Sequence, residues 1–174
     1  MSVPVALEHQ RRLPICRRVL PLLAVGAARL LATLRPRRLR AVLELARRGA
    51  RPATPAQAHA ARQAVVAVSL RCAGQGCLQR SIAAALYCRA HGSWPTWCTG
   101  VRTNPFAAHA WIQVDDHPIG EPHPAGHYRI LIAVPPPPPR TTHAWESASR
   151  HPNLRRAGQP SRAGFGVSRS ASRL

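Results

Sequence analysis

The sequence predicts an α+β fold in which helices come first and an antiparallel sheet follows. Apolar residues recur at three- and four-residue intervals between about residues 19 and 70, which is the period of amphipathic helices. After Gly92 three segments are rich in β-branched and aromatic residues, as strands are. With 174 residues, the chain has room for one modest domain and a small helical annex.

The first region, residues 1–71, is expected to be helical. Pro36 ends the first apolar stretch and Gly49 is a natural stop for the second. Thr54 followed by Pro55 matches an N-cap with proline at the first helical position. We expect helices at about 19–34, 39–46 and 55–70. They would form a structural layer or a docking surface, rather than a membrane-surface helix.

The second region, residues 72–135, is the predicted core. Gly74 and Gly76 break the chain before a fourth helix, which begins at Cys77 and ends near Gly92. Strands are expected at 96–101, 109–114 and 128–134. The third region, 136–174, begins in a run of five prolines and is rich in arginine, serine and glycine, so we expect a disordered tail from about residue 140.

The chain is strongly basic. Its 25 basic residues are all arginine, and against six acidic residues they give a net charge of +19. Such a charge favours an acidic peptide or another polyanion as partner, or reflects arginine wherever a basic residue is tolerated. The arginines are scattered and do not alternate with aromatic residues on a known module, so we do not expect nucleic-acid binding.

Cysteine usage and hydropathy indicate the compartment. Cysteines stand at 16, 72, 77, 88 and 98, an odd number with irregular spacing, which favours free thiols in the cytoplasm. Arginines before the apolar run 19–28 outline a signal peptide, which stays open as an alternative. However, the apolar pattern continues past the cleavage-like Val25-Gly26-Ala27, and Arg29 interrupts a run too short to cross a bilayer. We expect no membrane insertion.

Cys77 is the candidate nucleophile. Helix N-termini carry unsatisfied N–H groups and a partial positive charge, which favour a thiolate and could hold an oxyanion. Arg80 follows one turn later and adds a cation. The alternative is that Cys77 is a small buried apolar residue, the role we expect for Cys88 and Cys98.

His109 is the candidate base, because it opens an apolar strand in which it must find a polar partner. Glu121 is the candidate acid that orients it. If Asp115-Asp116-His117 forms a three-residue hairpin loop, Trp111 pairs with Glu121 and the carboxylate reaches the face of His109. A two-residue loop would turn Glu121 to the other face. Asp115, six residues along an extended strand from His109, is roughly 20 Å away.

A metal site is the competing interpretation. Cys72, Cys77, Cys88 and His91 make a four-ligand set, but their spacing lacks the paired C-x2-C of zinc sites. We therefore expect no metal at these residues.

The ordered motifs CLQRSIAAAL, GVR-x-x-PFAAHAWIQV, PIGEP and YR, which are densest in 71–134, resemble the transglutaminase-like cysteine peptidases of lasso-peptide biosynthesis, the B2 proteins. The resemblance implies a papain/transglutaminase-like core, with a nucleophile-bearing helix on an antiparallel sheet. It places the family's nucleophile on Cys77, its histidine on His109 and its acid, often aspartate, on Glu121.

The resemblance also implies the partners. They are a lasso-peptide precursor, whose leader the peptidase removes, and a small leader-binding protein. An ATP-dependent cyclase then closes the macrolactam, so ATP would belong to that enzyme and the resemblance implies no cofactor for this one. Two other classes remain open: a non-catalytic arginine-rich scaffold and a secreted basic protein.

Overall fold

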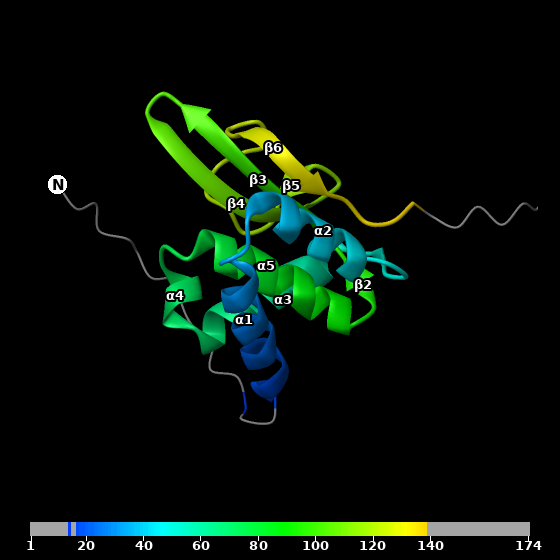
Figure 1. Cartoon of the computed structure of the whole chain (residues 1–174). Coiled ribbons are helices and arrows are strands. Elements are labelled where there is room, and N and C mark those ends of the chain that lie inside the picture. Colours follow the sequence, from blue (N-terminus) through cyan, green and yellow to red (C-terminus); the bar gives the residue numbers. More distant parts are fainter. Residues whose placement is uncertain (1–13, 15–16, 139–174) are drawn as a thin grey trace, which may run out of the picture. The chain divides into compact units, whose positions relative to one another are not determined.

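The chain folds as the α+β arrangement that the sequence predicts. The computed structural model describes Pro14 and residues 17–138, which belong to one compact unit. Helices pack on one side of a four-stranded antiparallel sheet (Figure 1). The predicted tail, Cys16 and the arginines at 11 and 12 lie outside the described residues.

The four predicted helices are present. They are α1 (Val19–Leu31), α2 (Pro36–Ala46), α3 (Pro55–Val68) and α5 (Cys77–Ala90). A one-turn helix that we did not predict, α4 (Leu70–Ala73), lies between the last two. Thr54 caps α3 as expected: its hydroxyl accepts the Gln57 N–H at 3.3 Å, and the Gln57 side-chain oxygen accepts the Thr54 N–H at 3.0 Å.

The main sheet has the strand order β5-β4-β3-β6. Its strands are β5 (His117–Pro118), β4 (Phe106–Val114), β3 (Thr96–Thr103) and β6 (Arg129–Val134). All three pairings are antiparallel, and an irregularity between Thr99 and Gly100 interrupts the pairing of β3 with β6. The three expected strands are thus confirmed, although His109 lies inside β4 and does not open it.

A second, two-stranded parallel sheet was missed. It pairs β1 (Arg51–Pro52) with β2 (Ser93–Trp94), so the end of α2 is joined to the end of α5. A two-residue strand is too short for a sequence pattern to indicate. The pairing holds the chain after α2 beside the chain after α5.

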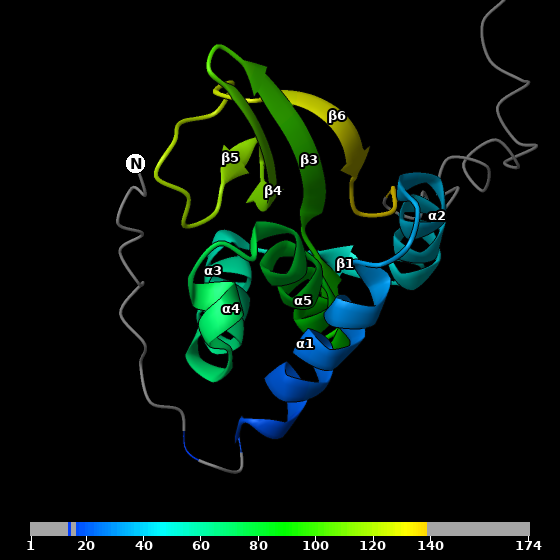
Figure 2. The same cartoon turned by 60° about the vertical axis from the view of Figure 1, so that its left-hand side comes forward.

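Helix α5 runs through the centre of the core and is not amphipathic. Ile82, Ala83, Ala84 and Ala85 are all fully buried, because α1 and α3 flank α5 and β4 packs across it (Figure 2). Small alanine side chains allow these neighbours to approach closely. The surroundings of α5 therefore determine where its first residue, Cys77, is held relative to β4.

Within residues 17–138, no helix is long and apolar enough to cross a membrane.

Candidate active site

Cys77 is the first residue of α5 and is half-buried. The turn before it requires glycine, since a Cβ at Gly76 would lie 2.5 Å from the carbonyl oxygen of Arg71. The Gly76 N–H donates to that same oxygen at 3.0 Å, which closes the loop against α4. The thiol is thereby held at the helix start and cannot retreat into the core.

His109 reaches Cys77 from the middle of β4. Its ring makes a hydrogen bond with the thiol, which is the main cause that lowers the pKa of Cys77; burial opposes it. The Ala110 backbone amide also donates to the sulfur and lowers the pKa further. This amide is available because β5 is too short to cover β4 at this point. Cys77 therefore lies against an open strand edge.

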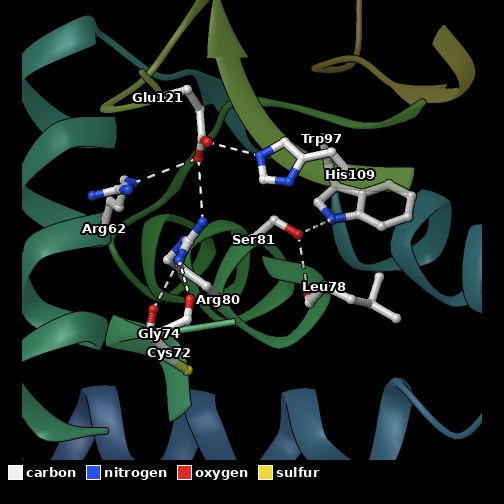
Figure 3. Close-up of polar contacts among 9 residues, drawn as sticks. All are labelled: Arg62, Cys72, Gly74, Leu78, Arg80, Ser81, Trp97, His109 and Glu121. Atoms are coloured by element: carbon white, nitrogen blue, oxygen red, sulfur yellow. Dashed lines mark hydrogen bonds and ion pairs between the residues drawn. The ribbon is translucent and has the colours of Figure 1, made fainter. Parts of the chain in front are cut away.

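Glu121 binds the other side of the imidazole. His109 Nε2 donates to Glu121 Oε2 at 2.7 Å, which leaves Nδ1 for the thiol (Figure 3). The hydrogen bonds to Cys77 and to Glu121 raise the pKa of His109 to about 9. The structure thus brings all three predicted site residues together, in the order thiol, imidazole, carboxylate.

The route by which Glu121 arrives differs from the one we predicted. Val114 pairs with His117, so the hairpin loop has two residues, Asp115 and Asp116, both with positive φ. The three-residue register is wrong. Strand pairing stops at Pro118, and Gly120 at φ +65° turns the chain back toward His109. The carboxylate is positioned by this irregular segment and not by a strand.

Two arginines surround Glu121, and from the sequence we expected neither of them beside this residue. Arg62 Nε lies 3.8 Å and Arg80 Nη2 lies 3.6 Å from Glu121 Oε1, and all three side chains are at most 10% exposed (Figure 3). Arg62 passes beneath Gly120, where a Cβ would come within 3.0 Å of its guanidinium. Both arginines place positive charge beside the buried carboxylate.

The sequence contains a pattern that could have identified Arg62 as a buried residue. It stands at helical spacing between Ala58 and Val65, on an otherwise apolar face of α3. A lone arginine on such a face needs a buried anion. Arg80 was expected to act on the thiol, but it is the last and weakest cause of the lowered Cys77 pKa. Its principal contacts are Glu121 and two backbone carbonyls.

A family model described as the transglutaminase-like superfamily matches residues 21–133. The chain belongs to the transglutaminase-like superfamily. The match begins inside α1 and ends inside β6, so the helices before Cys77 are part of the matched region. No curated protein and no solved structure matches the chain significantly.

The superfamily includes cysteine peptidases and transglutaminases, and this fold is of the cysteine-peptidase type. Both chemistries need a thiolate close to a protonated imidazole. The lowered pKa of Cys77 and the raised pKa of His109 favour that ion pair. Attack on a carbonyl carbon, followed by an acyl-enzyme, is the reaction that this arrangement can perform.

The expectation of free N–H groups beside the nucleophile needs correction. The Cys77 N–H is occupied, since it donates to the Gln75 carbonyl at 2.9 Å. An oxyanion would have to displace Gln75 before it could use this amide. The Ala110 amide is also engaged, through its hydrogen bond to Cys77 Sγ.

The other described cysteines are set apart from this transglutaminase-like site. Cys72, Cys88 and Cys98 are buried, and burial raises the pKa of Cys88 and of Cys98 to about 12 each. This confirms that Cys88 and Cys98 pack as small apolar residues. Across residues 17–138, no group of three or more His, Cys, Asp or Glu side chains is arranged to hold a metal ion.

Proposed function

We propose that this protein is a cysteine peptidase that removes the leader from a ribosomally made lasso-peptide precursor. The observation that carries the proposal is the continuous contact from Cys77 through His109 to Glu121. Membership of the transglutaminase-like superfamily supports the peptidase chemistry. The ordered resemblance between residues 71 and 134 supports the choice of substrate.

In the proposed reaction, Cys77 attacks as a thiolate while His109 holds the proton. Sulfur bonds to the carbonyl carbon at the leader–core junction and forms a tetrahedral intermediate. When this intermediate collapses, the C–N bond breaks and His109 gives its proton to the leaving amine of the core. Water, deprotonated by His109, then attacks the thioester, which releases the leader and regenerates the thiol.

Glu121 acts in this proposal as a positioning residue. Its bond to Nε2 keeps Nδ1 directed at the sulfur and stabilises the imidazolium. Arg62 and Arg80 lie 3.8 and 3.6 Å from the other carboxylate oxygen and surround it with positive charge. Glutamate in place of the family's more common aspartate is accommodated because Glu121 follows the sharp turn at Gly120 and reaches the histidine from further back.

The proposed partner is a small protein that binds the leader and brings the junction to Cys77. Arginines 35, 37, 38 and 40, at and within α2, are exposed and offer an acidic partner or leader a charged surface. On α1 the exposed residues Val19, Leu22, Leu23 and Leu30 offer an apolar alternative. No cofactor takes part, and ATP would serve only the cyclase that follows.

A cleavage time course on a synthetic precursor tests the proposal. The full chain is assayed with and without the leader-binding protein, at low and high salt, well below saturation. Docking raises effective concentration, so the partner should increase the rate by roughly 10²–10⁴-fold. A smaller gain at high salt would indicate docking through the arginines, and a salt-independent gain would indicate docking through α1.

The control is Cys77→Ala, which should give no cleavage, whereas Cys98→Ala should retain some. Cleavage by folded Cys77→Ala would exclude the proposed nucleophile. Lack of any cleavage by the wild-type chain with its partner would favour a non-catalytic scaffold, and equal rates with and without the partner would mean that the peptidase recognises its substrate unaided.

A further inference from the structure

A pocket opens beside His109 on the face of the sheet that carries its side chain. His109, Trp111 and Gln113 line it from alternate positions of β4, and Tyr128, Ile130 and Pro124 contribute from the segments that follow. Its volume is about 230 Å³. An apolar cavity of roughly 150 Å³ accommodates a benzene ring, so this pocket has room for one large side chain.

Three polar side chains of the pocket are hydrogen-bonded to one another. Trp111 Nε1 donates to Gln113 Oε1 at 2.9 Å, and Gln113 Nε2 donates to Asp116 Oδ1 at 3.2 Å. The remaining surface is mostly apolar, and three rings form a cluster in it: the centroid of His109 lies 6.0 Å from that of Trp111 and 5.1 Å from that of Tyr128, and the last two are 5.9 Å apart. Such a surface suits an uncharged apolar or aromatic side chain.

The pocket lies on the His109 side of the site, away from Cys77. His109 and Glu121 line it, while Cys77 does not. Cys77 lies instead in a separate groove at the start of α5, beside Gln75 and Gly76, which shares no residue with the pocket. The histidine therefore stands between the nucleophile and the pocket.

The chemistry assigns a direction to a bound peptide. The scissile carbonyl carbon must approach the sulfur of Cys77, and the nitrogen that leaves must approach the imidazole that protonates it. The chain that precedes the scissile bond then lies toward the groove at α5. The chain that follows it passes His109 and reaches the pocket.

We infer that the pocket formed by Trp111, Tyr128 and Ile130 binds an apolar or aromatic side chain at the first or second residue after the scissile bond. This inference rests on the proposed peptidase function. It adds a specificity site for the part of the substrate that leaves with the new amine, a part for which the leader-binding partner offers no recognition.

Acyl transfer tests this site without knowledge of the natural precursor. The full chain is acylated with a small p-nitrophenyl ester: sulfur bonds to the acyl carbon and p-nitrophenolate leaves. An added amine then competes with water for the thioester. Its nitrogen bonds to the acyl carbon, the sulfur departs as thiolate, and His109 takes the proton. An attacking amine occupies the place of the leaving amine in the reverse reaction.

The amines are glycinamide, leucinamide and phenylalaninamide, with the same three residues preceded by glycine to probe the second position. The ratio of amide to acid product is measured, corrected for the reaction of each amine with a free thioester. Because this ratio counts only acylated enzyme, it does not depend on the folded fraction. In at least one series the leucine and phenylalanine amines should be captured roughly tenfold better than glycine.

Variants then locate the preference. Ile130→Trp and, on the exposed loop, Ala125→Trp both fill the pocket and should reduce the preference to less than twofold. Leu131→Trp, at the adjacent exposed position outside the pocket, should keep it. Equal capture of all amines, or an unchanged preference in both filled variants, overturns the inference while acylation stands. Failure of the ester to acylate Cys77 overturns the proposed function, and the inference with it.

Discussion

Arg80 ties the carboxylate of Glu121 to the loop that precedes Cys77. Its Nη2 lies 3.6 Å from Glu121 Oε1, and its Nη1 donates to the carbonyls of Cys72 and Gly74 at 3.0 and 3.1 Å. One planar guanidinium thus links the segment after β5 to the start of α5. Lysine has a single charged atom and cannot make this set of contacts.

Replacing Arg80 is therefore expected to harm both stability and activity. Arg80→Gln removes one of the positive charges beside the buried carboxylate of Glu121. The substitution should reduce the free energy of unfolding by about 3 to 5 kcal/mol. Arg80→Lys should recover only part of this. Denaturant unfolding with peptidase assays measures both effects. Arg40→Gln, which breaks the exposed pair with Glu44 at 2.8 Å, is the control and should change stability by about 1 kcal/mol or less.

Alkylation should distinguish the cysteines. At neutral pH, Cys77 should react with iodoacetamide much faster than Cys88 and Cys98, because His109 lowers its pKa while burial raises theirs to about 12. Mass spectrometry of digests gives the modified positions against time. His109→Ala should slow the reaction of Cys77. Alkylation of Cys98 at a similar rate would mean that the core opens around it.

Activity should follow a bell-shaped pH profile. The active pair needs a thiolate at Cys77 and a proton on His109, so the rate should fall in acid as the thiolate is protonated, and in base as His109 loses its proton near pH 9. The proton on His109 binds more tightly in the folded chain than in the unfolded one. Its contribution to stability is thus complete below about pH 6.5 and is lost as the pH rises through about 9.

Ring NMR titration of His109 provides the direct measurement. In Cys77→Ala the pKa of His109 should be lower than in the wild type, since the hydrogen bond to Cys77 is the largest cause of its elevation. Glu121→Gln should also lower it. An unchanged pKa in both variants would contradict the contact between the three residues.

The acid can be tested against its neighbours in the hairpin. Glu121→Gln should reduce turnover less than His109→Ala, but clearly more than Asp115→Asn, since Asp115 is an exposed loop residue. It should also destabilise the fold, because Arg62 and Arg80 lose their buried counter-charge. If Asp115→Asn were the more damaging, Glu121 would not be the residue that orients His109.

Gly120→Ala tests the turn that carries Glu121. A left-handed alanine costs about 1 to 2 kcal/mol, and here its Cβ would also press on the Arg62 guanidinium at 3.0 Å. Gly49→Ala is a matched control, with φ +73° and open space around it. The difference between the two free energies of unfolding isolates the contact with Arg62. Equal losses would show that Arg62 moves aside freely.

The helices and strands were predictable because their signals are local. Thr54 followed by Pro55 indicates a helix start, because apolar residues at helical spacing come directly after them. Cys77 is recognisable as a helix N-terminus because Gly74 and Gly76 precede it. The short strands β1 and β2 were not predictable, because each is extended only through its pairing with the other strand, which is far away in the sequence.

The register at Glu121 failed for a physical reason. Asp115 and Asp116 both tolerate positive φ, which allows a two-residue turn as well as the longer loop that we expected. Glu121 nevertheless contacts His109, because the turn at Gly120 brings its carboxylate to the imidazole in spite of the different register. The apolar face of α3 distinguishes Arg62 from the other arginines, but it does not reveal the partner of Arg62, which lies 59 residues further along the chain.

The contacts of Glu121 also determine the charge of the resting site. In the ion-pair form that the pKa shifts of Cys77 and His109 favour, two guanidinium groups and one imidazolium face one carboxylate and one thiolate, which leaves a single positive charge in excess. When a substrate carbonyl becomes tetrahedral, its oxygen gains one negative charge while the thiolate loses its own by forming the C–S bond. The excess of one positive charge is therefore unchanged when the tetrahedral intermediate forms, and it attracts the anionic oxygen of that intermediate. The ion-pair form of the site is therefore not electroneutral. An anionic group of a ligand bound beside Cys77 would compensate the remaining positive charge.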